Sequence, residues 1–141
     1  MVRPPYQRTY NEAELPQVVQ ELKAWGAGVR RWFLVGPMGA GKTHLVRTWI
    51  GPLVSSPTFT YIHHYPGAVH VDLYRFPLEV PSRLSELEEL LDTAPLIFVE
   101  WADRWPPLRE WPGVWVWLWP EGPDRRRLRA DFRPPPPLGG A

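Results

Sequence analysis

The chain has 141 residues, 44% of them hydrophobic and 22% charged, and a formal net charge of +1, which predicts one globular domain and does not by itself indicate a nucleic-acid binder. It has no cysteine, which excludes disulfides, thiolate metal sites and a cysteine nucleophile. No apolar run is long enough to span a membrane and residues 1–10 lack the apolar core of a secretory signal, so we expect a cytoplasmic protein.

Apolar runs alternate with helical patterns, which favours an α/β domain over residues 1–132 with a sheet buried on both faces. The proline-rich segment 133–141 is expected to be a flexible tail. The expected elements, in chain order, are an arm or edge strand over 1–10, a helix over 12–25, a strand over 31–35, a helix over 42–50, strands over 55–62 and 68–73 around a turn at 63–67, a helix over 81–91, and strands over 96–99, 114–119 and 124–132.

A glycine-rich segment follows the strand predicted over 31–35. Gly36, Gly41, Lys42 and Thr43 match the pattern G-x-x-x-x-G-K-[ST], with an apolar strand before it and a helix after it. Glycines let successive backbone N–H groups turn toward phosphate oxygens, and the helix N-terminus adds positive potential. The lysine reaches the terminal phosphates, and the threonine hydroxyl serves Mg²⁺. The pattern predicts a P-loop NTPase fold, with a mostly parallel central sheet flanked by helices.

Two carboxylates follow predicted strands and are candidates for the remaining chemistry. Glu100 follows the apolar run LIFV, and Asp72 follows VHV. In this class of sheet such residues anchor Mg²⁺ or place the attacking water. Asp72 has a structural alternative, a salt bridge with Arg75. Thr58 is a candidate switch threonine that meets the γ-phosphate or Mg²⁺, or else a plain strand threonine.

The motif for reading guanine, N-K-x-D or T-K-x-D, is missing, so ATP is the expected nucleotide. A small-molecule kinase uses the same phosphate-binding loop and is the alternative to an ATPase. Such kinases typically have a lid that bears several arginines. The only dense arginine group in this sequence is the cluster at 125–129, which is not where a lid normally lies. A module that binds nucleotide without hydrolysing it is a third possibility.

Three further groups of residues have more than one interpretation. The four histidines are either ligands of a zinc site or residues at surface loop and strand positions, and the second interpretation is favoured because no zinc-ligand spacing is present among His44, His63, His64 and His70. The alternate tryptophans of the run 114–119 lie on one strand face, where they fill the core, dock a partner or stack on bases. The arginines of 125–129 contact tRNA phosphates or belong to a solvated edge strand.

Four segments occur in order at close spacing: GPMGAGKTHLVR, SPTFTYIHHY, HVDLYRF and VEWADR. Together they resemble the TsaE family, the small ATPases of bacterial tRNA threonylcarbamoyladenosine biosynthesis, over roughly residues 10–119. The resemblance implies a P-loop ATPase that binds ATP and Mg²⁺. It also implies partners, the synthase subunit TsaD and its paralogue TsaB, with tRNA contacted indirectly and no membrane.

The resemblance also implies roles for single residues. Thr43 and Glu100 would serve Mg²⁺, with Glu100 also near the attacking water. Asp72 would support the Mg²⁺ shell or the hydrolytic geometry, Thr58 would lie on a switch-like loop, and Trp101 would pack beside the site or at the partner surface. His44 stands where the family commonly has a second threonine, and Pro37 where it commonly has an acid. The expected nucleotide-binding set is Gly36, Gly39, Ala40, Gly41, Lys42, Thr43 and His44.

Overall fold

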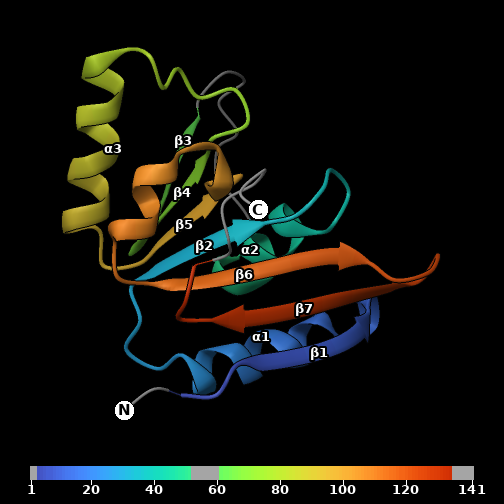
Figure 1. Cartoon of the computed structure of the whole chain (residues 1–141). Helices are drawn as coiled ribbons and strands as arrows, with labels where there is room; N and C mark the ends of the chain where they lie inside the picture. Colours follow the sequence, from blue (N-terminus) through green and yellow to red (C-terminus); the bar gives the residue numbers. More distant parts are fainter. Residues whose placement is uncertain (1–2, 52–60, 135–141) are drawn as a thin grey trace.

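The computed structural model describes residues 3–51 and 61–134. Within these residues, seven strands form one sheet in the order β1-β7-β6-β2-β5-β4-β3 (Figure 1). The four central strands β6, β2, β5 and β4 run parallel, whereas β1, β7 and β3 pair antiparallel with their neighbours. The strands are β1 (Tyr6–Asn11), β2 (Arg31–Val35), β3 (Ile62–Tyr65), β4 (Ala68–Asp72), β5 (Ile97–Glu100), β6 (Val114–Pro120) and β7 (Arg125–Asp131). The α/β class and the mostly parallel central sheet are confirmed.

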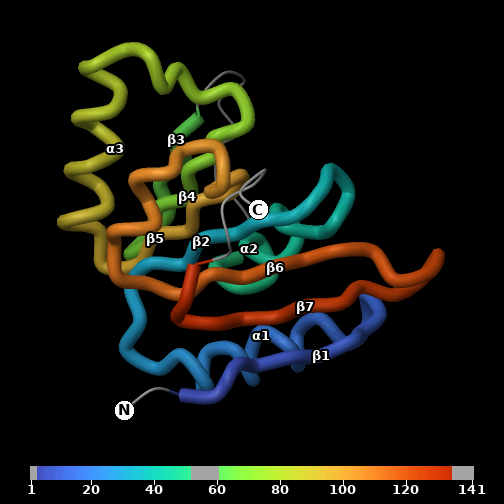
Figure 2. Tube along the Cα trace, viewed as in Figure 1, coloured from blue at the N-terminus to red at the C-terminus, as the bar shows by residue number. Residues whose placement is uncertain are grey.

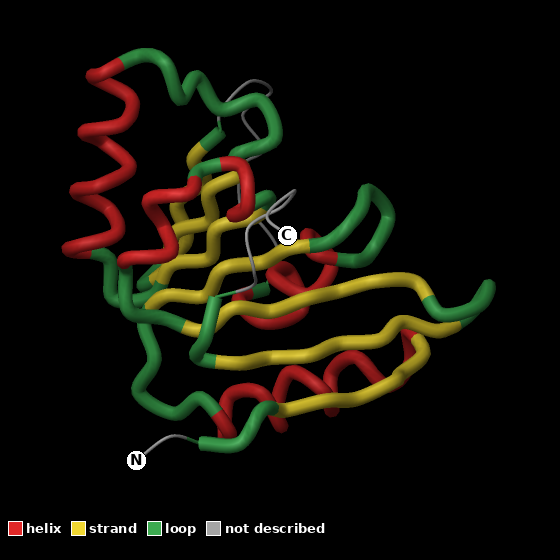
Figure 3. Tube along the Cα trace, viewed as in Figure 1, coloured by secondary structure: helices red, strands yellow, loops and turns green. Residues whose placement is uncertain are grey.

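Helices cover both faces of this sheet (Figure 3). On one face, α1 (Leu15–Trp25) and α2 (Lys42–Ile50) share a core with Trp32 and Leu34 of β2. On the other, α3 (Pro81–Thr93) shares a core with Phe33, the residue between them. Successive strand side chains point to opposite faces, so a continuous apolar run such as RWFLV is the sequence of a strand buried on both sides.

One edge of the sheet collects several chain segments (Figure 2). The parallel strands β2, β4, β5 and β6 all end there. Strand β7 is antiparallel to β6 and β1 is antiparallel to β7, so β7 begins and β1 ends at this same edge. The glycine-rich loop, the two candidate carboxylates and the start of β7 are therefore neighbours in space, although they are distant in sequence.

The turn predicted over 63–67 is wrong. His63, His64 and Tyr65 belong to β3 and pair with His70, Val69 and Ala68. The connection is a two-residue turn, Pro66-Gly67, in which Gly67 has a φ of 78°. A two-residue hairpin turn favours a residue of positive φ, which glycine adopts without steric cost. Histidines are polar, but an edge strand such as β3 can carry polar side chains.

Other boundaries differ by a few residues. The helix predicted from residue 12 begins as a 3₁₀ turn, Glu12–Glu14, and becomes α-helical at Leu15, because Pro16 is tolerated only in the first turn. Two further 3₁₀ turns, Ala102–Arg104 and Pro106–Glu110, were not predicted. The strand predicted over 55–62 lies mostly outside the described residues. None of the helices in the described part of the chain is long and apolar enough to cross a membrane.

Candidate functional site

The loop between β2 and α2 has the backbone geometry of a phosphate cradle. Gly39 and Gly41 have φ values of 79° and 99°, in the left-handed region that favours glycine. At position 36 glycine is required for a steric reason instead, since a Cβ on Gly36 would lie 2.1 Å from the Leu118 carbonyl oxygen. Ala40 is fully buried and its N–H donates to the Pro37 carbonyl oxygen at 3.1 Å. The loop thus presents backbone and the N-terminus of α2 to its concave side.

Lys42 lies in this loop with only 4% of its surface exposed. Its Nζ donates to the carbonyl oxygens of Gly36 at 2.6 Å and Pro37 at 3.0 Å, and lies 4.2 Å from the centre of the Trp101 ring. Burial lowers the pKa of the ammonium, while the nearby carboxylates of Glu100, Asp103 and Asp72 act in the opposite direction. The charge is held by backbone dipoles and an aromatic face beside the predicted phosphate position.

Glu100 and Thr43 meet as their sequence positions predict. The Thr43 Oγ1 donates to both carboxylate oxygens of Glu100, at 2.9 Å each. Glu100 has 2% of its surface exposed, and His70 on the neighbouring strand β4 contacts its Oε2 through Nε2. A buried carboxylate needs such partners. His70 therefore fixes the carboxylate that faces the loop.

Asp72 lies next to Glu100 in the sheet register. Its Oδ1 accepts a hydrogen bond from the Tyr74 backbone N–H at 2.9 Å. The alternative salt bridge with Arg75 does not form among the described residues, where Arg75 lies instead over the Tyr74 ring. Asp72 is thus available to the loop side of the site.

Two cavities adjoin the loop. The first, of about 420 Å³, is lined by the loop residues 38–43 together with His44, Asp72, Tyr74, Glu100, Trp101 and Arg126. The second, of about 490 Å³, is lined by Tyr10, Asn11, Glu12, Ala13, Leu15, Gly41, His44, Pro123, Asp124 and Arg126. We call them the loop cavity and the β1 cavity. Gly41, His44 and Arg126 line both.

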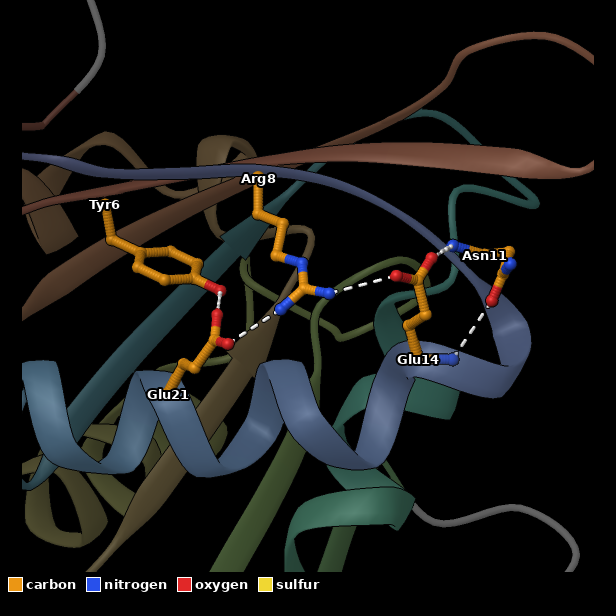
Figure 4. Close-up of polar contacts among 5 residues, drawn as sticks. All are labelled: Tyr6, Arg8, Asn11, Glu14 and Glu21. Carbon is orange, nitrogen blue, oxygen red and sulfur yellow. Dashed lines mark hydrogen bonds and ion pairs between the residues drawn. The ribbon is translucent and has the colours of Figure 1, made fainter.

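A polar network links β1 to the start of α1 (Figure 4), and one of its members, Asn11, lines the β1 cavity. Tyr6 and Arg8 of β1 donate to Glu21 of α1 at 2.5 and 2.7 Å, and Arg8 also donates to Glu14 at 3.0 Å. Asn11 and Glu14 form a capping box, each side chain accepting from the other's backbone N–H. Burial, followed by the hydrogen bond to Glu21, raises the pKa of the Tyr6 hydroxyl. The network holds β1 and the start of α1 in one geometry.

The remaining residues of interest are placed as follows. Thr58 lies outside the described residues. His44 is 55% exposed, and its Nε2 lies 3.5 Å from a Glu12 carboxylate oxygen. Within the described residues no three His, Asp or Glu side chains converge as a metal site. The histidine whose role matters is His70, whose importance appears only once β4 is paired with β5.

The tryptophans and arginines of β6 and β7 divide between the core and the surface. Trp115 is buried, with its ring centre 4.9 Å from that of Phe33, so the core interpretation is confirmed for this residue. Trp119 is half-buried under Arg127. The arginines also divide by strand parity. Arg127 is exposed, whereas the neighbouring Arg126 lines both cavities.

The parallel central strands, the glycine-rich loop between β2 and α2 and the carboxylates at the strand ends define a protein of the P-loop type. The model of one family, described as threonylcarbamoyl adenosine biosynthesis protein TsaE, matches residues 9–121, and the chain belongs to this family. The family functions in a tRNA modification pathway. The predicted family is therefore confirmed.

A solved structure supports the fold. The chain is similar to the crystal structure of Bacillus subtilis YdiB, with a TM-score of 0.66 and 22% sequence identity over 94% of this chain and 88% of that one. At this identity the likeness shows the fold alone. No curated protein matches the chain.

Proposed function

We propose that the chain binds and hydrolyses Mg-ATP, and that this supports the tRNA threonylcarbamoyladenosine synthase formed by TsaD and its paralogue TsaB. The observation that carries the proposal is the meeting of Lys42, Thr43 and Glu100 at one glycine-rich loop. The family supplies the pathway, and the chemistry of the side chains supplies the reaction. A cytoplasmic location, where the tRNA substrate is modified, belongs to the same proposal.

The residues present fit a magnesium nucleotide. Mg²⁺ prefers hard oxygen ligands and takes only one or two from the protein, with phosphates and water supplying the rest. The Thr43 hydroxyl and the Glu100 carboxylate lie 2.9 Å apart and are the expected pair. The loop amides and Lys42 would hold the phosphates. Bound Mg²⁺ would neutralise charge that develops on the phosphate oxygens.

Hydrolysis also needs a water molecule placed in line with the terminal phosphate. Glu100 and Asp72 both line the loop cavity and are the candidates for orienting that water. Thr58 is assigned to the switch segment by the family resemblance. A geometry that a partner completes would make the isolated chain slow and the complex faster.

The kinase alternative gains no support from the arginine cluster. Residues 125–129 belong to strand β7 and are paired on both sides within the sheet, so they do not form a mobile lid. A kinase would consume ATP only with an acceptor, which provides the discriminating measurement.

The experiment is phosphate release from ATP by the chain alone, and with TsaD and TsaB. We expect a clear rise with the pair, which Glu100→Ala abolishes while ATP binding remains. Glu88→Ala, an exposed acid on α3, is the matched control. Release unchanged by the pair, from a chain that does not bind it, would contradict the proposed role. Hydrolysis unchanged in Glu100→Ala would move the catalytic role to Asp72 or another residue.

A further inference from the structure

Arg126 lies at the boundary between the two cavities beside the loop. It alternates along β7 with Arg125 and Arg127, so its side chain points to the opposite sheet face from theirs, the face that carries Leu128 and Ala130 against α1. A Cβ built at Gly41 would lie 3.1 Å from Arg126 Nε and 3.5 Å from its Cδ. The arginine side chain therefore lies directly over the last glycine of the phosphate-binding loop.

The surroundings of Arg126 leave its charge without a carboxylate partner. Among the described residues, Arg8 and Arg129 each form an ion pair with an acid, whereas Arg126 forms none. Glu12 and Asp124 line the β1 cavity with it, but neither lines the loop cavity. The positive charge of Arg126 favours ionisation of the neighbouring Tyr10, but burial is the larger effect and raises the pKa of that phenol to about 12. A half-buried guanidinium without an acid, beside a helix N-terminus, is suited to a bound anion.

The order of groups along the site indicates which part of a nucleotide this anion would be. Lys42, Thr43 and Glu100, the groups for the terminal phosphates, line the loop cavity only. The β1 cavity has an apolar and aromatic part in Leu15 and Tyr10 and polar atoms at Asn11, which suits a nucleoside. Gly41, His44 and Arg126 are what the two cavities share. A nucleotide that spans both cavities would pass its first phosphate beside these three residues.

We infer that Arg126 is a nucleotide-binding residue that holds the α-phosphate, where the phosphate chain leaves the loop toward the nucleoside. The inference rests on the proposed function, because it takes the occupant of the loop to be a nucleoside triphosphate. It adds a ligand from strand β7, more than 80 positions after the loop in sequence. An arginine can form two hydrogen bonds to one phosphate in a fixed geometry, which a lysine cannot match.

The test is calorimetric titration of the full chain with ATP and with ADP, both with Mg²⁺. We expect Arg126→Gln to lower the affinity for ATP and for ADP by the same factor, about tenfold to a hundredfold, because both nucleotides carry the α-phosphate. Arg126→Lys should fall between the glutamine variant and the wild type. The matched controls are Arg125→Gln and Arg127→Gln, which remove the same charge from neighbouring positions on the opposite face of β7 and should leave affinity nearly unchanged.

Several results would overturn the assignment. Equal losses in Arg126→Gln and the two controls would indicate a general charge effect, and unchanged affinity would leave Arg126 with no role. A loss for ATP alone would place the contact at the γ-phosphate. If Arg126→Gln does not fold, a comparison of Arg126→Lys with Arg127→Lys decides, since equal affinities would overturn the inference. A wild-type chain that binds neither nucleotide would defeat the proposed function itself, a result distinct from all of these.

Discussion

At the scale of single residues, removal of the Lys42 side chain is the most direct test of phosphate binding by the glycine-rich loop. Lys42→Ala should lower the affinity for ATP by about a hundredfold or more, because a buried charge-assisted contact to phosphate is lost. Lys23, the other lysine of the chain, is exposed and lies over the Trp49 ring. Lys23→Ala is therefore the matched control. Titration of both variants with ATP checks the expectation, and wild-type affinity in Lys42→Ala would contradict the assignment of the loop.

His70 gives a second residue-scale expectation, based on its contact with Glu100. His70→Ala should lower the turnover number for ATP hydrolysis about tenfold and leave KM nearly unchanged, because the carboxylate loses the partner that fixes it. His70→Gln should restore part of the rate, since its amide can still donate to Glu100. Steady-state kinetics of both variants provide the measurement. A lower free energy of unfolding with an unchanged turnover number would show that His70 serves packing alone.

Which of these residues the sequence predicts depends on how local the signal is. Lys42, Thr43 and the loop glycines follow from one contiguous pattern, and Glu100 from its position after an apolar strand. His70 and Arg126 carry no such local signal. Their roles depend on the pairing of β4 with β5 and on the side of β7 that meets the helices. The alternation of arginines with Leu128 and Ala130 could have marked Arg126 as the inward-facing member of the cluster.

At the scale of elements, Asn11 joins the end of β1 to the start of the first helix and lines the β1 cavity. Asn11→Ala should lower the free energy of unfolding by about 1 kcal/mol, the usual cost of losing a capping side chain. Gln7→Ala, at an exposed position of the same strand, should change stability little. Urea unfolding of both variants measures the difference. Equal stability of the two would mean that the capping box does not hold this corner.

Elements with a clear apolar pattern and clear end signals were predicted closely, and elements without such signals were not. The strand at 31–35 and the helix at 42–50 match to the residue, because apolar runs and glycines delimit both. Strand β3 was missed because its four residues include two histidines, and its pairing with β4 provides the stabilisation that its own composition does not indicate. The 3₁₀ turns between β5 and β6 have no periodic pattern to find.

At the scale of the whole molecule, the sheet is the common wall of two apolar cores. Leu22 of α1 is fully buried in one and Leu87 of α3 in the other. Phe33 and Leu34, adjacent in β2, face the two cores in turn, so loss of either core exposes one side of the same strand. We therefore expect the described residues of the sheet and its helices to unfold as one unit, which would agree with the single domain that the sequence predicts.

Leu22→Ala and Leu87→Ala test that single unit. Each should lower the free energy of unfolding by about 2–5 kcal/mol, the cost of a cavity in a packed core. Each should also shift one shared transition rather than split it, because the cores are joined through the sheet. Tryptophan fluorescence reports packing and far-ultraviolet circular dichroism reports helices, so coincident denaturant curves would support one cooperative domain. Two separate midpoints in either variant would show that the α3 side unfolds independently of the side that carries the phosphate-binding loop.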